Sequence, residues 1–198
     1  MLSLTEELTQ SIAYQGREYP IDLSYDNVLR FYQLLDDADF DEGEKIIAAF
    51  HIFFDEEVPD DPEFLMNVVK LLGEYVSDSP YGGDTASSQD GQAPIRYFSF
   101  QQDAPAIYAS FMEQYGIDLI EEQGKLHWDK FKALLDGLGP ETQFRRIVAI
   151  RQRTTDGLEG EELAALMEQQ QYYRLTDGAS VDAQTQRTDA MLDALFKQ

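Results

Sequence analysis

The sequence predicts a mainly α protein: an irregular multi-helix domain with a short N-terminal β-hairpin and a flexible mid-chain acidic loop. Several segments repeat apolar residues at spacings of three and four between capping residues, which is the helical pattern. The first 21 residues alternate instead, as a hairpin does. With 198 residues, of which 43% are hydrophobic, the chain can fill an ordinary core, and we expect a single domain over residues 1–198.

The hairpin and the first helix follow each other closely. Ile12, Tyr14, Tyr19 and Ile21 alternate around Gln15-Gly16, a dipeptide suited to a tight turn. Ser24 then has the residue type of a helix N-cap. The apolar stripe expected for this helix contains Tyr25, Val28, Leu29, Tyr32 and Leu35.

The next two helices also have recognisable starts. Asp41 followed by Glu44 resembles a capping box with Asp in place of Ser or Thr, and Pro62 after Asp61 is suited to a first helical turn. The apolar face expected after Asp41 contains Ile46, Ile47, Phe50, Phe53 and Phe54. The face expected after Pro62 contains Phe64, Leu65, Val68, Leu71, Leu72 and Tyr75.

Apolar periodicity stops in residues 77–95, which are rich in Gly, Ser, Asp and Pro, so we expect a flexible loop or linker there. Helices are then expected from about Asp103 to a left-handed cap at Gly116, from His127 to Asp136, and from Pro140 to Arg153. Residues 154–198 are expected to form a polar helical C-terminal extension. Its two helices are predicted around 161–173 and at the end, where Met191, Leu192, Leu195 and Phe196 recur.

The net charge of −23 is unevenly distributed. Residues 1–124 hold 26 acidic and 5 basic side chains. Residues 125–153 hold 3 acidic and 7 basic side chains, and residues 154–198 hold 9 acidic and 3 basic ones. Such an acidic chain repels nucleic acid and anionic lipid and attracts basic partners, so we expect neither nucleic acid nor membrane as a partner. Solubility alone is the simpler explanation of the charge.

The sequence gives no sign of an enzyme or of a cofactor. It has no Cys, no phosphate-binding loop and only two His. No partner motif would make His127 a general base, and a role in capping a helix or at the edge of the core is the simpler one for it. Asp37, Asp39 and Asp41 have the spacing of calcium ligands, but Glu42 and Ala48 occupy positions that need Gly and Glu. His51 and Asp55 share a helical face without a HExxH motif. No signal peptide or membrane-spanning run is visible, so we expect a cytoplasmic protein.

Four side chains are candidates for binding a partner: Trp128, Arg145, Arg146 and Arg153. Trp128 belongs to a helical apolar stripe, so core packing is the alternative to partner contact. The arginines, with Arg151, could bind phosphate, although a basic helix in an acidic chain more often pairs with its own carboxylates or with those of a second subunit. We expect Arg145 and Arg146 to face solvent or a partner, and weak homo-oligomers to form through them.

Several short sequence motifs follow one another along the chain in an order that is similar to that of a known family. They are Phe98 to Ala104, Ile107 to Phe111, Tyr115 to Leu119, Leu126 to Phe131, Gly137-Leu138 and Ile147 to Arg151, with a weaker match over Asp22 to Phe50. This order resembles the small acidic tail-assembly chaperone family of long-tailed, siphovirus-type bacteriophages and prophages, over about three quarters of the chain. The chain departs from the family at Asp129, where members often carry a second aromatic residue.

The resemblance implies a chaperone that binds the tape-measure protein of a phage tail, keeps it soluble and helps recruit tail-tube subunits. It would act in the cytoplasm of an infected host or lysogen and be absent from the mature virion. Two alternatives remain: an acidic DNA mimic that inhibits a host nucleic-acid-binding protein, against which the basic segment 125–153 counts, and a structural subunit of the virion tail.

Overall fold

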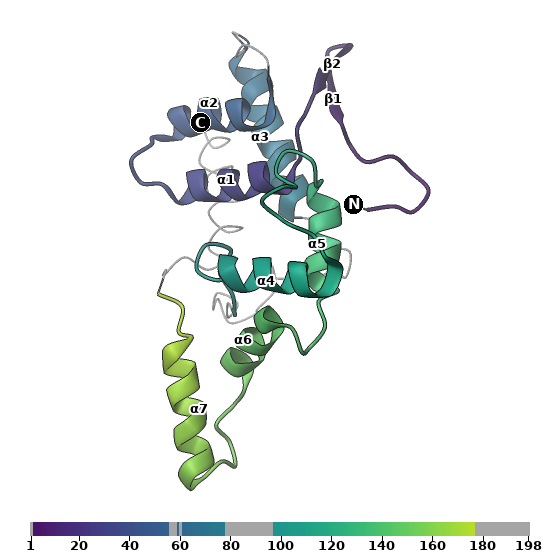
Figure 1. The fold of residues 1–198 in the computed structure, drawn as a ribbon. Coiled ribbons are helices and arrows are strands. Elements are labelled where there is room, and N and C mark those ends of the chain that lie inside the picture. The colour runs from purple at the N-terminus through teal and green to yellow at the C-terminus, as the bar shows by residue number, and fades with distance from the viewer. Residues whose placement is uncertain (1, 56–58, 60, 78–96, 177–198) are drawn as a thin grey trace. The chain divides into compact units, whose positions relative to one another are not determined.

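The computed structural model describes residues 2–55, 59, 61–77 and 97–176 (Figure 1). These residues form two strands and seven helices, so the mainly α fold with an N-terminal hairpin is confirmed. The loop predicted for 77–95 lies outside the described residues except for Ser77, which is the last residue of a helix. The final predicted helix lies outside them as well. No helix in the described ranges is long and apolar enough to cross a bilayer.

The chain divides into two compact units. Among the described residues, unit 1 contains those up to 77 together with 123–133, and unit 2 contains 97–122 and 134–176. The chain passes from one unit to the other within helix α5 (Trp128–Asp136). Each unit has its own buried aromatic residues, and the expected single-domain organisation stays a prediction.

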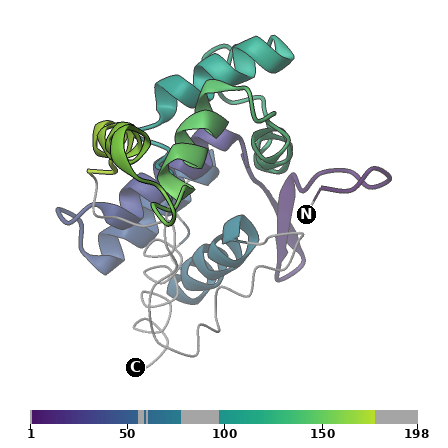
Figure 2. The same cartoon turned by 90° about the horizontal axis from the view of Figure 1, so that it is seen from below.

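Strands β1 (Ser11–Tyr14) and β2 (Arg17–Pro20) of unit 1 form the predicted antiparallel hairpin, with Ile12 paired to Tyr19. Its two-residue turn has positive φ at Gln15 (47°) and Gly16 (80°), the geometry that matches the twist of the strands. The rings of Tyr14 and Tyr19 lie 4.5 and 4.6 Å from that of Phe64. These ring contacts attach the hairpin to the start of α3. The hairpin and α3 lie side by side in the ribbon views of Figures 1 and 2.

Helices α1 (Tyr25–Asp36), α2 (Glu42–Phe53) and α3 (Pro62–Ser77) form the body of unit 1. The capping box of α2 is confirmed: the Glu44 N–H donates to Asp41 Oδ1 and the Asp41 N–H to Glu44 Oε2, both at 2.9 Å. Ser24 holds the N-cap position of α1, but its buried hydroxyl makes no capping bond. Fully buried rings fill the space between the helices: Phe31, Phe50, Phe53 and Phe64.

The buried faces of these helices differ in part from the predicted stripes. Ile47 and Leu71 are 47% and 49% exposed, and Leu29 and Tyr32 are only half-buried. The places expected for them are taken by Phe31, Leu34, Val69 and Val76. Each helix has apolar residues over more than half of its circumference, so spacing alone left the orientation of the helix open.

Unit 2 is built from α4 (Ala104–Tyr115), the end of α5, α6 (Gln143–Gln152) and α7 (Gly160–Tyr172). Helix α4 ends at Gly116 in the left-handed conformation, as predicted. Helix α6 begins at Gln143 rather than Pro140, because residues up to Thr142 form a turn in which Thr142 donates to the Gly139 carbonyl at 2.7 Å. α6 packs on α4, and α7 packs on α6 (Figure 1).

Candidate functional site

Trp128 lies in the core of unit 1 with 2% of its surface exposed. Its indole N–H donates to the Val76 carbonyl at 3.4 Å, and its ring stacks on Phe131 with centroids 5.6 Å apart. The rings of Tyr32 and Trp128 form a T-shaped pair with centroids 6.0 Å apart. Trp128 therefore packs in the core, which was the alternative to partner contact in the sequence analysis. Partner binding through its side chain stays a prediction.

The segment before α5 is fixed to the segment before α1 by a short antiparallel bridge between Ser24 and His127. The Trp128 N–H donates to the Leu23 carbonyl at 2.8 Å, and the Tyr25 N–H donates to the Leu126 carbonyl at 2.9 Å. Residues about a hundred positions apart therefore share backbone hydrogen bonds. This bridge brings the start of the Leu126 to Phe131 motif into the N-terminal part of the fold.

His127 caps α5, one of the two roles, capping or a place at the core edge, that the sequence favoured over catalysis. Its Nδ1 accepts from the Asp129 N–H at 3.1 Å, which leaves the proton on Nε2 to be donated to the Thr9 carbonyl at 3.2 Å. Burial lowers the pKa of His127 from its ordinary value, against the Thr9 bond and the Asp129 charge, which raise it. Both ring nitrogens are thus used in hydrogen bonds, and the bond that Nδ1 accepts requires the tautomer with its proton on Nε2.

Asp129, the second residue of α5, is a buried carboxylate. It is 3% exposed, accepts from the Tyr75 hydroxyl at 2.7 Å and lies 3.5 Å from Lys132 Nζ. Burial by itself would raise the pKa of Asp129, but the Tyr75 bond and the Lys132 charge together hold it below its ordinary value. The carboxylate thus makes polar contacts to α3 through Tyr75 and within α5 through Lys132.

Arg145 is half-buried and holds the turn between α5 and α6. Its Nε donates to the Leu138 carbonyl at 3.2 Å and its Nη2 to the Asp136 carbonyl at 2.8 Å, close to the C-terminal end of α5. A cation is favourable at that end of a helix. Arg145 therefore has a structural use within unit 2 that the helical spacing did not indicate.

Arg146 and Arg153 are the more accessible arginines of this group, with side chains 62% and 50% exposed. Arg146 pairs with Glu141 at 3.1 Å and Arg153 with Glu162 at 2.6 Å. Exposed pairs of this kind contribute about 0 to 1 kcal/mol and exchange readily for another carboxylate. Both guanidinium groups are therefore available to an acidic partner at little cost.

Arg151 is placed quite differently, with 7% of its side chain exposed. Its guanidinium group makes two bonds to Asp103, of 2.6 and 2.8 Å, and further bonds to the carbonyls of Tyr97 (2.9 Å) and Tyr173 (2.7 Å). Asp103 also accepts from the Ser99 N–H at 2.9 Å. One side chain thus joins the segment before α4, the end of α6 and the end of α7.

The acidic residues considered as metal ligands have local structural roles. Asp37 Oδ1 accepts from the Asp39 N–H at 2.9 Å, and Asp41 is the N-cap of α2. In the part of the chain that the structure describes, no three acidic or His side chains come together in a way that would hold a metal ion.

Three polar side chains of α4 and its preceding turn have roles that the sequence did not reveal. Gln102 bonds to the Arg174 carbonyl and the Thr176 N–H, and Gln114 bonds to Gly137 and Gly139. The buried Ser110 hydroxyl accepts from the Phe144 N–H at 3.0 Å and so caps α6 from a neighbouring helix. The position of Gln102 and Asp103 inside the Phe98 to Ala104 motif was the only available signal, since their partners are distant in sequence.

The family model described as Bacteriophage Gp15 protein matches residues 4–175. The match spans both strands and all seven described helices, including the Trp128 surroundings and the Asp103–Arg151 pair. No curated protein and no solved structure matches the chain.

Proposed function

This chain belongs to the Bacteriophage Gp15 protein family, and we propose that it is a tail-assembly chaperone that binds the tape-measure protein of a phage. In this role it keeps the tape-measure protein soluble and helps recruit tail-tube subunits, without enzymatic chemistry. It acts in the cytoplasm of the infected host or lysogen and does not remain in the mature virion.

The family match carries the proposal, because it makes the chain a phage protein over most of its length. The order of motifs that resembles tail-assembly chaperones adds the specific role, and the physical properties of the chain suit it. A partner with long amphipathic helices needs apolar surface to cover it and charge to keep the complex dissolved. The net charge of −23 supplies the second requirement.

The proposed role also agrees with how the polar side chains are used. Within the described residues, the arginines of α6 and the histidine before α5 bond to backbone or carboxylate groups and do not converge on a shared site. Such an arrangement supports a binding protein over a catalyst. A DNA mimic is less favoured, because the exposed Arg146 and Arg153 would meet the basic surface of a nucleic-acid-binding host protein.

Co-expression provides the test. The tape-measure protein of the same phage is produced alone and together with this chain, and its soluble fraction and co-purification are measured. We expect the chain to raise the soluble fraction several-fold and to co-purify. An unchanged soluble fraction without co-purification would contradict the proposal.

Mass spectrometry of purified virions tests the second part. A chaperone is expected to be absent or present far below one copy per tail ring. Stoichiometric amounts in the virion would favour the structural-subunit alternative.

A further inference from the structure

Helix α4 is apolar on both of its sides. One side packs inward through Ala106, Ile107, Ser110 and Phe111, which are all buried. The opposite side, named here the α4 outer face, consists of Pro105, Tyr108, Ala109 and Met112. Pro105 and Met112 are exposed and the other two are half-buried. Adjoining apolar side chains that stay exposed on a helix commonly mark a contact surface, so the α4 outer face is expected to have a partner.

The turn after α4 extends this face. The Tyr108 hydroxyl donates to Asp118 Oδ2 at 3.1 Å, while Asp118 Oδ1 accepts from the Ile120 N–H at 2.9 Å. These two bonds pin the turn to the helix at Tyr108. Ile120 lies on this turn next to the buried Leu119, and 64% of its surface is exposed. The outer face and Ile120 together present a preformed apolar surface.

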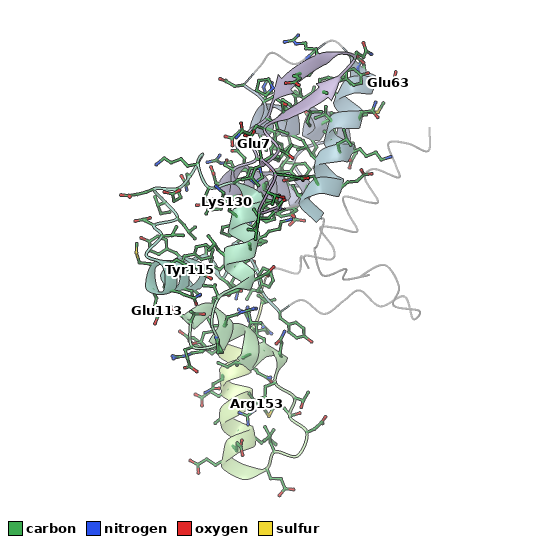
Figure 3. All side chains as sticks on the ribbon, turned by 90° about the vertical axis from the view of Figure 1, so that its right-hand side faces the viewer. Glu7, Glu63, Glu113, Tyr115, Lys130 and Arg153 are labelled. Carbon is green, nitrogen blue, oxygen red and sulfur yellow. The ribbon has the colours of Figure 1, made fainter. Side chains whose placement is uncertain are left out.

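The chain segment that carries this surface is acidic, although Arg151 pairs with Asp103 at the start of α4. Residues 97–124 contain five acidic side chains and no Lys or Arg. Glu113 is the single charged residue of α4 and extends from it in Figure 3, and Glu121 is exposed on the turn that holds Ile120. An apolar strip with an acidic border is complementary to an apolar stripe with a basic border.

We propose that the α4 outer face with Ile120 is the docking surface for an amphipathic helix of a partner protein, in which Lys or Arg flank the apolar stripe. Resting on the proposed function, this identifies the kind of tape-measure segment that the chain holds. A second copy of the chain is a poor occupant of this surface, because it carries the same net charge of −23 and the same acidic border. The apolar residues provide affinity, and the acidic border selects for basic helices.

Binding of two synthetic helical peptides provides the test. Both have the same Leu stripe, flanked by Lys in one and by Glu in the other, and binding is followed by fluorescence anisotropy. We expect saturable, salt-sensitive binding of the Lys peptide only. Met112→Glu should weaken that binding about tenfold or more, the loss typical of a central apolar contact. Equal binding of both peptides would overturn the charge argument.

Met167→Glu is the matched control, because Met167 is a helical Met of the same unit with 57% of its surface exposed. It should change peptide binding less than twofold. Ile120→Glu, on the turn, serves as a second variant in case Met112→Glu lowers stability, and should also weaken binding. Unchanged binding in a folded Ile120→Glu variant, or equal losses with Met167→Glu, would overturn the proposed surface.

The tape-measure protein itself separates this inference from the proposed function. If the chain binds the tape-measure protein and folded Met112→Glu and Ile120→Glu variants bind it equally well, the surface is wrong while the chaperone role stands. If the chain binds the Lys peptide through this surface and ignores the tape-measure protein, the surface stands and the chaperone role fails. Sedimentation that shows dimers lost in Ile120→Glu alone would identify a second copy as the occupant and overturn the proposal.

Discussion

Arg151 at the end of α6 and Asp103 at the start of α4 form a two-point ion pair across 48 residues of sequence. Both side chains are more than nine-tenths buried, and each has further bonds to the backbone. The fork of an arginine suits this geometry, because two parallel N–H groups meet two carboxylate oxygens. The pair joins two of the sequence motifs on which the phage resemblance rests.

Replacing either member of this pair should destabilise unit 2 strongly. We expect Arg151→Met to lower the free energy of unfolding by about 3 to 5 kcal/mol, because Asp103 remains as a buried charge without its counter-charge. The double variant with Asp103→Asn should recover part of the loss. Urea denaturation measures both, with Arg146→Met as the exposed control, expected within about 0.5 kcal/mol of the wild type. Equal effects of the two arginine variants would contradict this role.

Ser110→Ala should remove the cap that α4 provides for α6. The Phe144 N–H would lose its acceptor in a buried position, at a cost of about 1 to 2 kcal/mol. Hydrogen exchange at the Phe144 amide should be faster in this variant. The increase should be larger than the loss of global stability alone would cause. Exchange that follows global stability alone would show that the Ser110 bond is unimportant in solution.

His127 should make stability depend on pH in a defined direction. Its pKa is lowered by burial in the folded protein, so the unfolded state binds the proton more tightly. The stabilisation is complete above the unfolded pKa of about 6.5 and is lost as the pH falls through the folded value. His127→Asn keeps an oxygen acceptor for the Asp129 N–H without titrating, so the wild type should lose stability relative to it on acidification. An NMR titration that placed the ring pKa above its ordinary value would contradict this sign.

The predicted single domain can be tested through Trp128. It is the only Trp and lies in unit 1, so its fluorescence reports unit 1, whereas far-UV circular dichroism reports the helices of both units. If the chain unfolds as one cooperative domain, the two urea transitions should coincide. Separate midpoints would mean that unit 1 and unit 2 unfold independently.

The predicted weak self-association is best tested with variants chosen from the structure. Arg145 holds the α5–α6 turn, so reversing its charge would disturb that turn. Arg146→Glu with Arg153→Glu changes only exposed side chains and should reduce oligomer size at low salt in sedimentation experiments. Lys130→Glu, an exposed change outside α6, is the control. Assembly that is unaffected by the α6 variant would exclude this helix as the docking site.

The elements that could be predicted from the sequence are those whose signals are local. The turn at Gln15-Gly16, the capping box of Asp41 and Glu44, and the left-handed end of α4 at Gly116 each depend on residues within about four positions of one another. Backbone geometry imposes these requirements in any fold. They were therefore predictable without knowledge of the neighbours.

Tertiary structure alone decided which side of each helix is buried and which polar residues have distant partners. Ile47 of α2 was predicted to be buried and is exposed, whereas Phe31 of α1 was left out of the predicted stripe and is buried. Both helices are apolar over more than half of their circumference, so only the packed neighbours select the buried face. Arg145, Arg146 and Arg151 are three arginines of one helix that the sequence does not distinguish. Arg145 holds a turn, Arg146 is exposed, and Arg151 forms a buried ion pair. Their roles differ because each depends on an acceptor that the fold, and not the spacing of residues along one helix, brings within reach.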